Sequence, residues 1–346
     1  MEASDHVYAV MGEEGELFSL DVAKWRGGRS GAVSITYDAP WGTHDDHYLA
    51  TDAAIARGLS MDIEMVTWIF TQPKRAPLLE TYHQELLSQG IHFFGHGHTH
   101  ALHDTMTYEE AYSSFSTCFG LMTAWGFSPR AYAYPGSAGL LESTQRANRE
   151  AGFICARGST LEPDTWLLLA DGATDTLNWQ YLPSVPMGNG SYRYVQSHSE
   201  LSPILDQAVE RRAWVILMYH AIGIPEGWGY YPLDEFVADL DYIASQDLWC
   251  ANLDRAALYA LERQALQVQV ATVPGRRGDY ELTFSDGLPD EVYSEPLTAI
   301  LRFGVLSPAQ VRIDPPVGSG QPVPVVDGVA LLDLLPADTP ALLHLD

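Results

Sequence analysis

The chain has 346 residues, long enough for two domains and for a core that needs no disulfide support. Hydrophobic residues make up 46% and charged residues 18%, a balance that excludes a disordered chain. Asp and Glu number 45 against 19 Lys and Arg, for a formal charge of -26, so nucleic acid is not expected as a partner.

The three cysteines are far apart in the sequence and form no CxxC pair: Cys118, Cys155 and Cys250. We therefore expect buried thiols rather than a thiolate zinc site or a disulfide framework. No uninterrupted apolar run approaches the roughly 18 residues of a membrane span, so none is expected. Residues 1–5 lack the basic and then apolar profile of a signal peptide, which leaves the localisation open between the cytoplasm and secretion after removal of a leader. The sequence does not indicate an oligomeric state.

The first regular elements predict one βαβ unit. Residues 32–37 (AVSITY) are β-branched and end at Asp38, which predicts a buried strand that opens into a loop. Residues 48–57 have the apolar spacing of a helix and stop at a glycine. Residues 63–70 (IEMVTWIF) are expected to form the next strand.

The same alternation continues along the chain. We expect further strands at residues 91–94, 131–134, 153–156 and 214–219, and helices near residues 77–88, 108–125, 141–151, 233–245 and 253–265. Residues 160–193 have no clear period and are assigned to long loops. Strands that alternate with helices imply a parallel sheet, open or closed into a barrel, with functional loops at the carboxyl ends of the strands.

The pattern changes at residue 266. Residues 268–271 and 280–284 alternate between apolar and polar, and turn residues recur, so a small all-β domain is predicted for residues 266–346. The prolines at 315–316 and 322–324 belong on edge strands or in loops, because proline cannot donate a hydrogen bond within a central ladder. The predicted domains are therefore 1–265 and 266–346.

The densest local signal is the histidine-rich segment GHGHTHALHD, residues 95–104, which follows a predicted strand. Neutral imidazole nitrogens bind Zn²⁺ and similar ions, and His96 and His100 are spaced so that both can reach one ion if the segment coils. The glycines beside His96 let the backbone turn and approach the ion closely. His98 and His103 are expected to be structural.

Two other strand ends also present reactive side chains. Asp38 can serve as a base, as a metal ligand or only as a turn former, and Asp45 and Asp46 in the following segment offer further oxygen donors. His220 ends the apolar strand WVILMY, and we interpret it as a proton carrier rather than a core histidine. The small residues of 134–139 (YPGSAG) either direct backbone N–H groups at an oxyanion or form a plain tight turn.

Taken in order, these segments resemble the NodB-homology polysaccharide deacetylases, carbohydrate esterase family four. The segments are AVSITYD, GLSMDIEMV, GHGHTH, AYAYPG, AGFICARGST and WVILMYHAIG, and the resemblance covers roughly Lys24 to Leu266. It implies an α/β fold, a deformed (β/α) barrel of the NodB type, to which the C-terminal residues add a small β-sandwich-like domain. It also implies a mononuclear metal site, usually zinc, and hydrolysis of N- or O-acetyl groups on sugars.

The resemblance assigns a role to each matching position. Asp38 matches the catalytic base, and His96 and His100 match the two metal-binding histidines. His220 matches the histidine that donates a proton to the leaving group. Gly136 falls at the position whose backbone N–H helps to hold the oxyanion.

Several positions depart from the family pattern, and two of them, Ala39 and Ala133, bear on the site. Ala39 stands where the family's second aspartate binds the metal, which is consistent either with a natural site or with an engineered inactive one. Ala133 stands where many members carry an arginine that orients the base. A metal would then depend on two imidazoles and water, or would take a carboxylate from Asp38, Asp45 or Asp46.

These observations leave three hypotheses. The leading one is a carbohydrate deacetylase that acts on an acetylated sugar and uses a divalent metal, Zn²⁺ first, with Co²⁺, Ni²⁺ or Mn²⁺ as alternatives. The second keeps the hydrolase fold with a small amide, imide or ester as substrate. The third is a non-catalytic glycan-binding relative with an eroded metal site. Substrate identity and the choice between amide and ester stay open at this level.

Overall fold

The computed structural model describes residues 8–12, 15–38, 44–170, 177–191, 193–304 and 307–346, and they form two compact units. The first unit contains the described residues between 31 and 257. The second contains those before residue 31 and those from residue 258 onward. Each unit has its own sheets, and each is described by itself.

The first unit is a closed parallel barrel, as predicted. Its strands pair in chain order, and the last pairs with the first, over Ala32–Tyr37 against Trp214–Tyr219, which closes the ring. The strands are β3 (Gly31–Tyr37), β4 (Met61–Met65), β5 (Ile91–Gly95), β6 (Ala131–Ala133), β7 (Cys155–Ser159), β8 (Leu182–Pro186) and β9 (Trp214–Tyr219). A further short strand, β10 (Leu248–Cys250), pairs with the start of β3. Because all barrel strands are parallel, their carboxyl ends share one rim.

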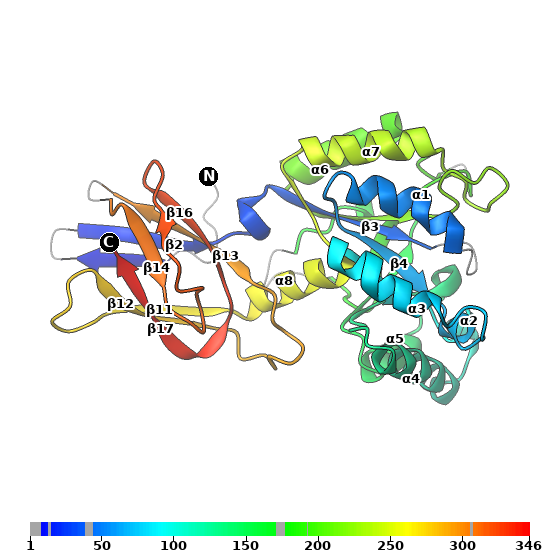
Figure 1. The fold of residues 1–346 in the computed structure, drawn as a ribbon, viewed down its shortest axis with the longest axis horizontal. Helices are drawn as coiled ribbons and strands as arrows, with labels where there is room; N and C mark the ends of the chain where they lie inside the picture. The colour runs from blue at the N-terminus through cyan, green and yellow to red at the C-terminus, as the bar shows by residue number, and fades with distance from the viewer. Residues whose placement is uncertain (1–7, 13–14, 39–43, 171–176, 192, 305–306) are drawn as a thin grey trace. The chain divides into compact units, whose positions relative to one another are not determined.

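Helices connect the strands, and Figure 1 shows α4 beside α5 and α6 beside α7. The longest described one, α4, begins at a capping box in which Thr107 and Glu110 bond each other's backbone N–H groups. The helices are α1 (His44–Ile55), α2 (Thr67–Phe70), α3 (Leu78–Thr81), α4 (Tyr108–Ala124), α5 (Glu142–Glu150), α6 (His198–Glu210), α7 (Leu233–Ser245) and α8 (Leu253–Ala265), with short 3₁₀ or π turns at 26–28, 82–89, 103–105, 135–137 and 163–165. Within the described part of the chain, none is long and apolar enough to cross a bilayer.

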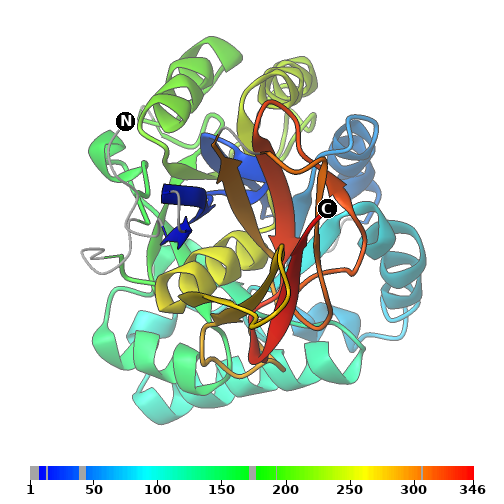
Figure 2. The same ribbon diagram turned by 90° about the vertical axis from the view of Figure 1, so that its left-hand side faces the viewer.

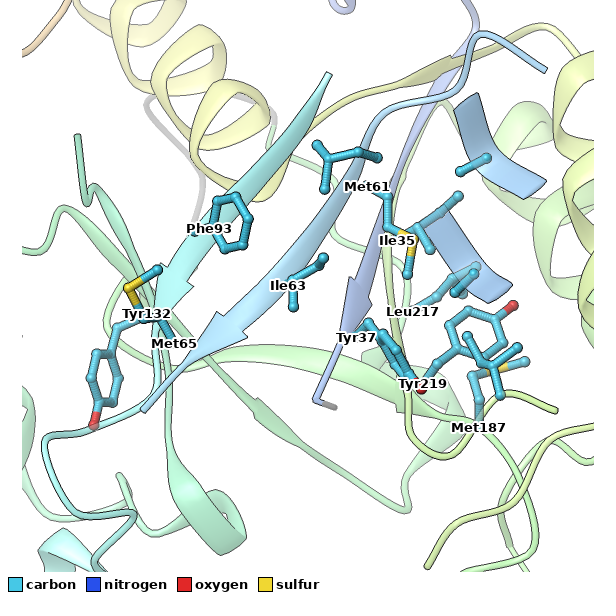
Figure 3. Close-up of a cluster of buried hydrophobic side chains, with 14 of the residues drawn as sticks. Ile35, Tyr37, Met61, Ile63, Met65, Phe93, Tyr132, Met187, Leu217 and Tyr219 are labelled. Atoms are coloured by element: carbon cyan, nitrogen blue, oxygen red, sulfur yellow. The ribbon is translucent and has the colours of Figure 1, made fainter. Parts of the chain in front are cut away.

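Successive side chains of a barrel strand point to opposite faces of the sheet, so each strand has two sets of side chains. One set packs into a large apolar cluster, part of which is drawn in Figure 3, including Ile35, Tyr37, Ile63 and Leu217. The alternate set on β3 continues to Asp38 and is polar. Arg157 on β7 bonds Asp38 although β7 and β3 are not neighbours, so this contact crosses the barrel interior.

Two local predictions were wrong. Residues 160–193 were assigned to loops, but β8 (Leu182–Pro186) lies there and completes the ring. Its two prolines hide the strand pattern in the sequence, and its ladder with β9 is short. Residues 63–70 were predicted as one strand, but β4 ends at Met65 and α2 covers Thr67–Phe70. A short apolar run does not distinguish a strand from a helical turn.

The second unit consists of two antiparallel sheets, as expected for a β-sandwich-like domain (Figure 2). Phe18 and Tyr280, from the two different sheets, make a T-shaped ring contact with 5.3 Å between ring centroids. Pro324 lies in the edge strand, as predicted. One sheet has the order β1 (Tyr8–Gly12), β2 (Gly15–Val22), β13 (Leu297–Phe303), β16 (Val329–Leu334), and the other β11 (Gln267–Thr272), β12 (Asp279–Ser285), β17 (Ala337–Leu345), β14 (Gln310–Ile313), β15 (Val323–Pro324).

The N-terminal strands belong to this second unit. Strand β2 pairs with β13, with Leu20 opposite Leu301, and Arg26 forms ion pairs with Glu295 and Asp333. The predicted boundary between residues 265 and 266 differs from this division, which falls inside α8 and gathers strands from both ends of the chain.

Candidate active site

A cavity of about 540 Å³ opens at the carboxyl ends of the barrel strands, within the size range of small-molecule sites. The five site residues predicted from the sequence all line it, although they come from four separate strand ends. The lining residues are Asp38, Glu64, His96, His100, Tyr134, Gly136, Ser137, Ser159, Tyr194, Met218, His220 and Trp228.

The imidazole of His96 is oriented so that the lone pair of its Nε2 is available to a metal ion. Its Nδ1 lies 2.9 Å from the Ala133 carbonyl oxygen, which can only accept, so Nδ1 carries the proton and Nε2 is left with its lone pair. Burial lowers the pKa of His96 to about 3, which keeps the ring neutral. A backbone carbonyl that fixes the tautomer in this way is a common feature of metal-binding histidines.

His100 lies next to His96, with ring centroids 4.8 Å apart. The backbone reverses between them, since Gly97 has φ 88° and His100 itself φ 57°. Burial lowers the pKa of His100 as well. The coiling that the four-residue spacing requires is therefore present.

The other two histidines of the segment do not line the cavity and make structural contacts, as expected. His98 Nδ1 lies 3.0 Å from Thr67 Oγ1. His103 is fully buried, stacks on Phe115 at a centroid distance of 4.2 Å, and lies 3.0 Å from Ser114 Oγ.

Asp38 is buried, and its carboxylate lies between the Arg157 guanidinium and the His220 imidazole. One carboxylate oxygen forms an ion pair with Arg157, and the other lies 3.8 Å from His220 Nε2. Burial by itself would raise the pKa of Asp38, but Arg157, His96 and His220 together bring it below its usual value. The carboxylate is therefore ionised and able to accept a proton.

Arg157 supplies a guanidinium beside the position where the sequence lacks one. In the pairing of β6 with β7, Arg157 is the register partner of Ala133. Arg157 thus lies on the strand next to the position where the resemblance implies an arginine, and it is directed at the Asp38 carboxylate. Sequence analysis missed Arg157 because the predicted strand ended at residue 156.

Glu64 is a further acidic residue in the cavity that sequence analysis did not select. It lies on β4, and its Oε2 is 3.2 Å from His96 Nε2. Burial, and then the negative charge of Asp38, raise the pKa of Glu64 well above its usual value. Asp38, Glu64 and His96 offer ligand atoms that all lie within 4.8 Å of one another, a nitrogen and oxygen set that suits Zn²⁺ and related divalent ions.

The structure does not describe the side chains of the other two acidic candidates, nor position 39. Ala39 lies outside the described residues. Asp45 and Asp46 lie in the first turn of α1, and their side chains are outside the description. Of the three carboxylates that the sequence offered as a third ligand, Asp38 is the one found beside His96.

His220 follows β9 and faces Asp38 across the cavity floor. Burial lowers its pKa to about 4, against the opposing effect of Asp38, so the ring is neutral near pH 7. The ring of Trp228 meets His220 edge-on, at 4.4 Å between centroids and 87° between planes, yet 62% of Trp228 is exposed. The ring centroid of Tyr194 lies 6.3 Å from that of Trp228, and the two side chains form an aromatic wall at the cavity mouth.

Gly136 also lines the cavity, in the turn that follows β6. Its φ of 58° is left-handed, and an added Cβ would lie 2.7 Å from a Leu102 methyl carbon. A glycine is therefore needed there to bring the backbone to the cavity surface.

A second group of carboxylates and imidazole lies at the amino ends of β4 and β5: Asp62, His92 and Asp254. Here Asp62 accepts hydrogen bonds from Leu253 N at 2.8 Å and Asn252 Nδ2 at 3.2 Å. These bonds satisfy donors at the start of α8, so the group has a structural role.

The closed parallel barrel with this arrangement of strand ends is the fold of the NodB-type polysaccharide deacetylases. A structure described as a probable polysaccharide deacetylase from Pseudomonas aeruginosa PAO1 matches 70% of this chain and 94% of its own, with 13% identity and a TM-score of 0.50. At this level of identity, the similarity establishes the fold.

Two other solved structures have lower scores. A carbohydrate deacetylase named Agd3 matches 93% of this chain and 66% of its own, with 9% identity and a TM-score of 0.49. A family 4 carbohydrate esterase from Streptomyces lividans, in complex with acetate, matches 64% and 92%, with 14% identity and a TM-score of 0.42. The sequence matches no protein-family model and no curated protein.

Proposed function

We propose that the protein is a metal-dependent hydrolase that removes N- or O-acetyl groups from a carbohydrate. The observation that carries this proposal is the convergence of an ionised carboxylate and three neutral imidazoles in one cavity. Asp38, the His96–His100 pair and His220 come from three separate strand ends, as a hydrolytic site assembled by the barrel requires.

His96 and His100 would hold the metal, with Zn²⁺ as the first choice. When bound, such an ion polarises an acetyl carbonyl and lowers the pKa of its bound water toward about 7. The donor set supports this assignment, since His96 Nε2 carries no proton of its own and lies 3.2 Å from a carboxyl oxygen of Glu64.

Asp38 would act as the base and accept a proton from the attacking water. Its ion pair with Arg157 supports this role, because it keeps the carboxylate charged and fixes its orientation. His220 would donate a proton to the leaving amine or alkoxide. Since His220 begins neutral, it first has to receive a proton, and Asp38 at 3.8 Å is the group placed to pass on the one it has accepted.

The cavity walls would position the acetyl group and the sugar. The Gly136 backbone would approach the carbonyl oxygen, where an N–H group can stabilise developing negative charge. Trp228 and Tyr194 would pack against the apolar face of a sugar ring at the mouth, and this aromatic wall favours a carbohydrate over a small amide or ester.

The test is acetate release from acetylated chito- and xylo-oligosaccharides in the presence of Zn²⁺ or Co²⁺. We expect turnover that His96→Ala abolishes and that His98→Ala, which changes a histidine outside the cavity, retains. Absence of release above the His96→Ala background would contradict the proposal. Activity that survives chelation would instead favour a metal-independent hydrolase of small amides or esters.

A further inference from the structure

We propose that Glu64 is the acidic metal ligand of this site and that it replaces the carboxylate absent from position 39. The inference rests on the proposed function, because it concerns the ion that His96 and His100 would hold. It assigns Glu64 to the metal and leaves Asp38 to the water.

Strand order places Glu64 correctly for this role. β4 lies between β3 and β5, and the registers pair Thr36 with Asp62 and Glu64 with Phe94. Two residues further along, β3 leads to Asp38, and β5 leads to His96. Glu64 is therefore directed into the cavity between the two strand ends that carry the base and the first imidazole.

The contact between Glu64 and His96 calls for a cation or a proton. His96 donates its only proton, from Nδ1, to the Ala133 carbonyl, so Nε2 is an acceptor. It lies 3.2 Å from Glu64 Oε2, which is an acceptor whenever the carboxylate is ionised. Two acceptors at this distance in a buried site are stabilised by a divalent ion that both can bind.

Asp38 has other partners. Its carboxylate is occupied by Arg157 on one oxygen and faces His220 with the other. Glu64, by contrast, has its polar contact with His96, one of the two imidazoles that would hold the metal. The guanidinium balances the charge of Asp38, so Glu64, on giving up its proton to bind a divalent ion, would balance part of the charge of that ion.

Both departures from the family pattern then have the same explanation. The carboxylate missing after β3 is supplied by β4, and the arginine missing on β6 is supplied by β7. In each case a residue one strand further around the barrel projects into the same part of the interior. The site would keep its charges while changing the positions in the sequence that carry them.

The experiment measures metal affinity directly, by competition of the full-length protein with a chelator for Zn²⁺ and by the visible spectrum of bound Co²⁺. The variants are Glu64→Gln, Glu64→Asp and His96→Ala. The control is His92→Gln, which alters the second carboxylate and imidazole group on the same two strands. We expect Glu64→Gln to weaken Zn²⁺ binding by about 100-fold or more, Glu64→Asp to weaken it less, and His92→Gln to leave it unchanged.

Thermal unfolding separates loss of the ligand from loss of the fold. Without metal, Glu64→Gln should unfold at or above the wild-type temperature, because its amide N–H can donate to His96 Nε2. Added Zn²⁺ should raise the unfolding temperature of the wild type and His92→Gln fully, of Glu64→Asp in part, and of Glu64→Gln and His96→Ala least. Retained affinity in Glu64→Gln together with lost affinity in His96→Ala would overturn the Glu64 assignment and leave the proposed function standing. Absence of Zn²⁺ binding by the wild type would instead overturn both.

Discussion

Arg157 and Asp38 form an ion pair across the inside of the barrel, from strands that do not pair with each other. The arginine is almost fully buried, and its carboxylate partner is the residue that ends β3. An ion pair in this position links the opposite side of the barrel to the carboxylate that the proposed reaction uses as a base.

We predict that Arg157→Met moves the acid limb of the pH profile of kcat/KM to higher pH, by about 1 unit or more. The guanidinium lowers the pKa of Asp38, so its removal leaves burial to raise that pKa, and the base is then protonated over a wider acidic range. Arg157→Lys should restore part of the shift. Arg146→Met, at an exposed arginine on α5, is the control, and an acid limb that does not move in Arg157→Met would show that Asp38 is not the titrating base.

The next prediction concerns proton donation. His220→Gln should lower kcat by about 10²- to 10⁴-fold with little change in KM, because the glutamine cannot carry a proton to the leaving group. Steady-state kinetics on an acetylated oligosaccharide checks this, with His98→Gln as a matched histidine outside the cavity. A kcat within twofold of the wild type would remove His220 from the mechanism.

The aromatic wall predicts a substrate-size effect. Trp228→Ala should raise KM for acetylated oligosaccharides by roughly 2- to 10-fold, and should affect a small acetyl ester less, because the ester does not extend to the cavity mouth. Trp68, 47% exposed on α2 and not part of the cavity lining, supplies the matched control Trp68→Ala. Equal effects of Trp228→Ala on both substrates would argue against sugar contact at this tryptophan.

A prediction of pH-dependent stability comes from the second unit. Burial raises the pKa of Glu262 to about 8, while the backbone N–H of Glu295 opposes the shift. A carboxyl with a raised folded-state pKa favours folding while it is protonated, so this contribution is present below about pH 4.5 and is lost as the pH rises through about 8.

Glu262→Gln should therefore become progressively more stable relative to the wild type between about pH 5 and pH 8. Denaturant unfolding at several pH values measures the difference in free energy of unfolding. The control is Glu281→Gln, which removes the same charge at an exposed site. A difference between Glu262→Gln and the wild type that does not change with pH would mean that Glu262 is already ionised in the folded protein.

The sequence predicted the parts of the site that lie at the ends of clear apolar strands. Asp38 and His220 each follow a strand with a strong pattern, and the histidine segment is unusual in itself. Glu64 was missed because it is inside a segment interpreted as a buried strand. The available signal was the alternation of Met61, Ile63 and Met65 with two acids, which is typical of a strand with one polar face.

The fold was predicted where helices and strands alternate with distinct periods. Strand β8 was not predicted because its prolines break the alternation, and β10 was not predicted because it is only three residues long. Strand β2 was not predicted for a different reason: its partner in the sheet, β13, is almost 300 residues away in the sequence. The pattern of residues within one segment does not reveal pairing with a strand so far away in the sequence.

The pairing of β2 with β13 also bears on how the protein is made. Strand β2 is synthesised before the barrel, and it acquires its neighbour β13 only after the whole barrel has emerged from the ribosome. Until then β2 has an unpaired edge, and a fragment that begins after residue 30 would leave β13 without that partner. The barrel can therefore complete its folding during translation, before the sheet that contains β2 and β13 can form.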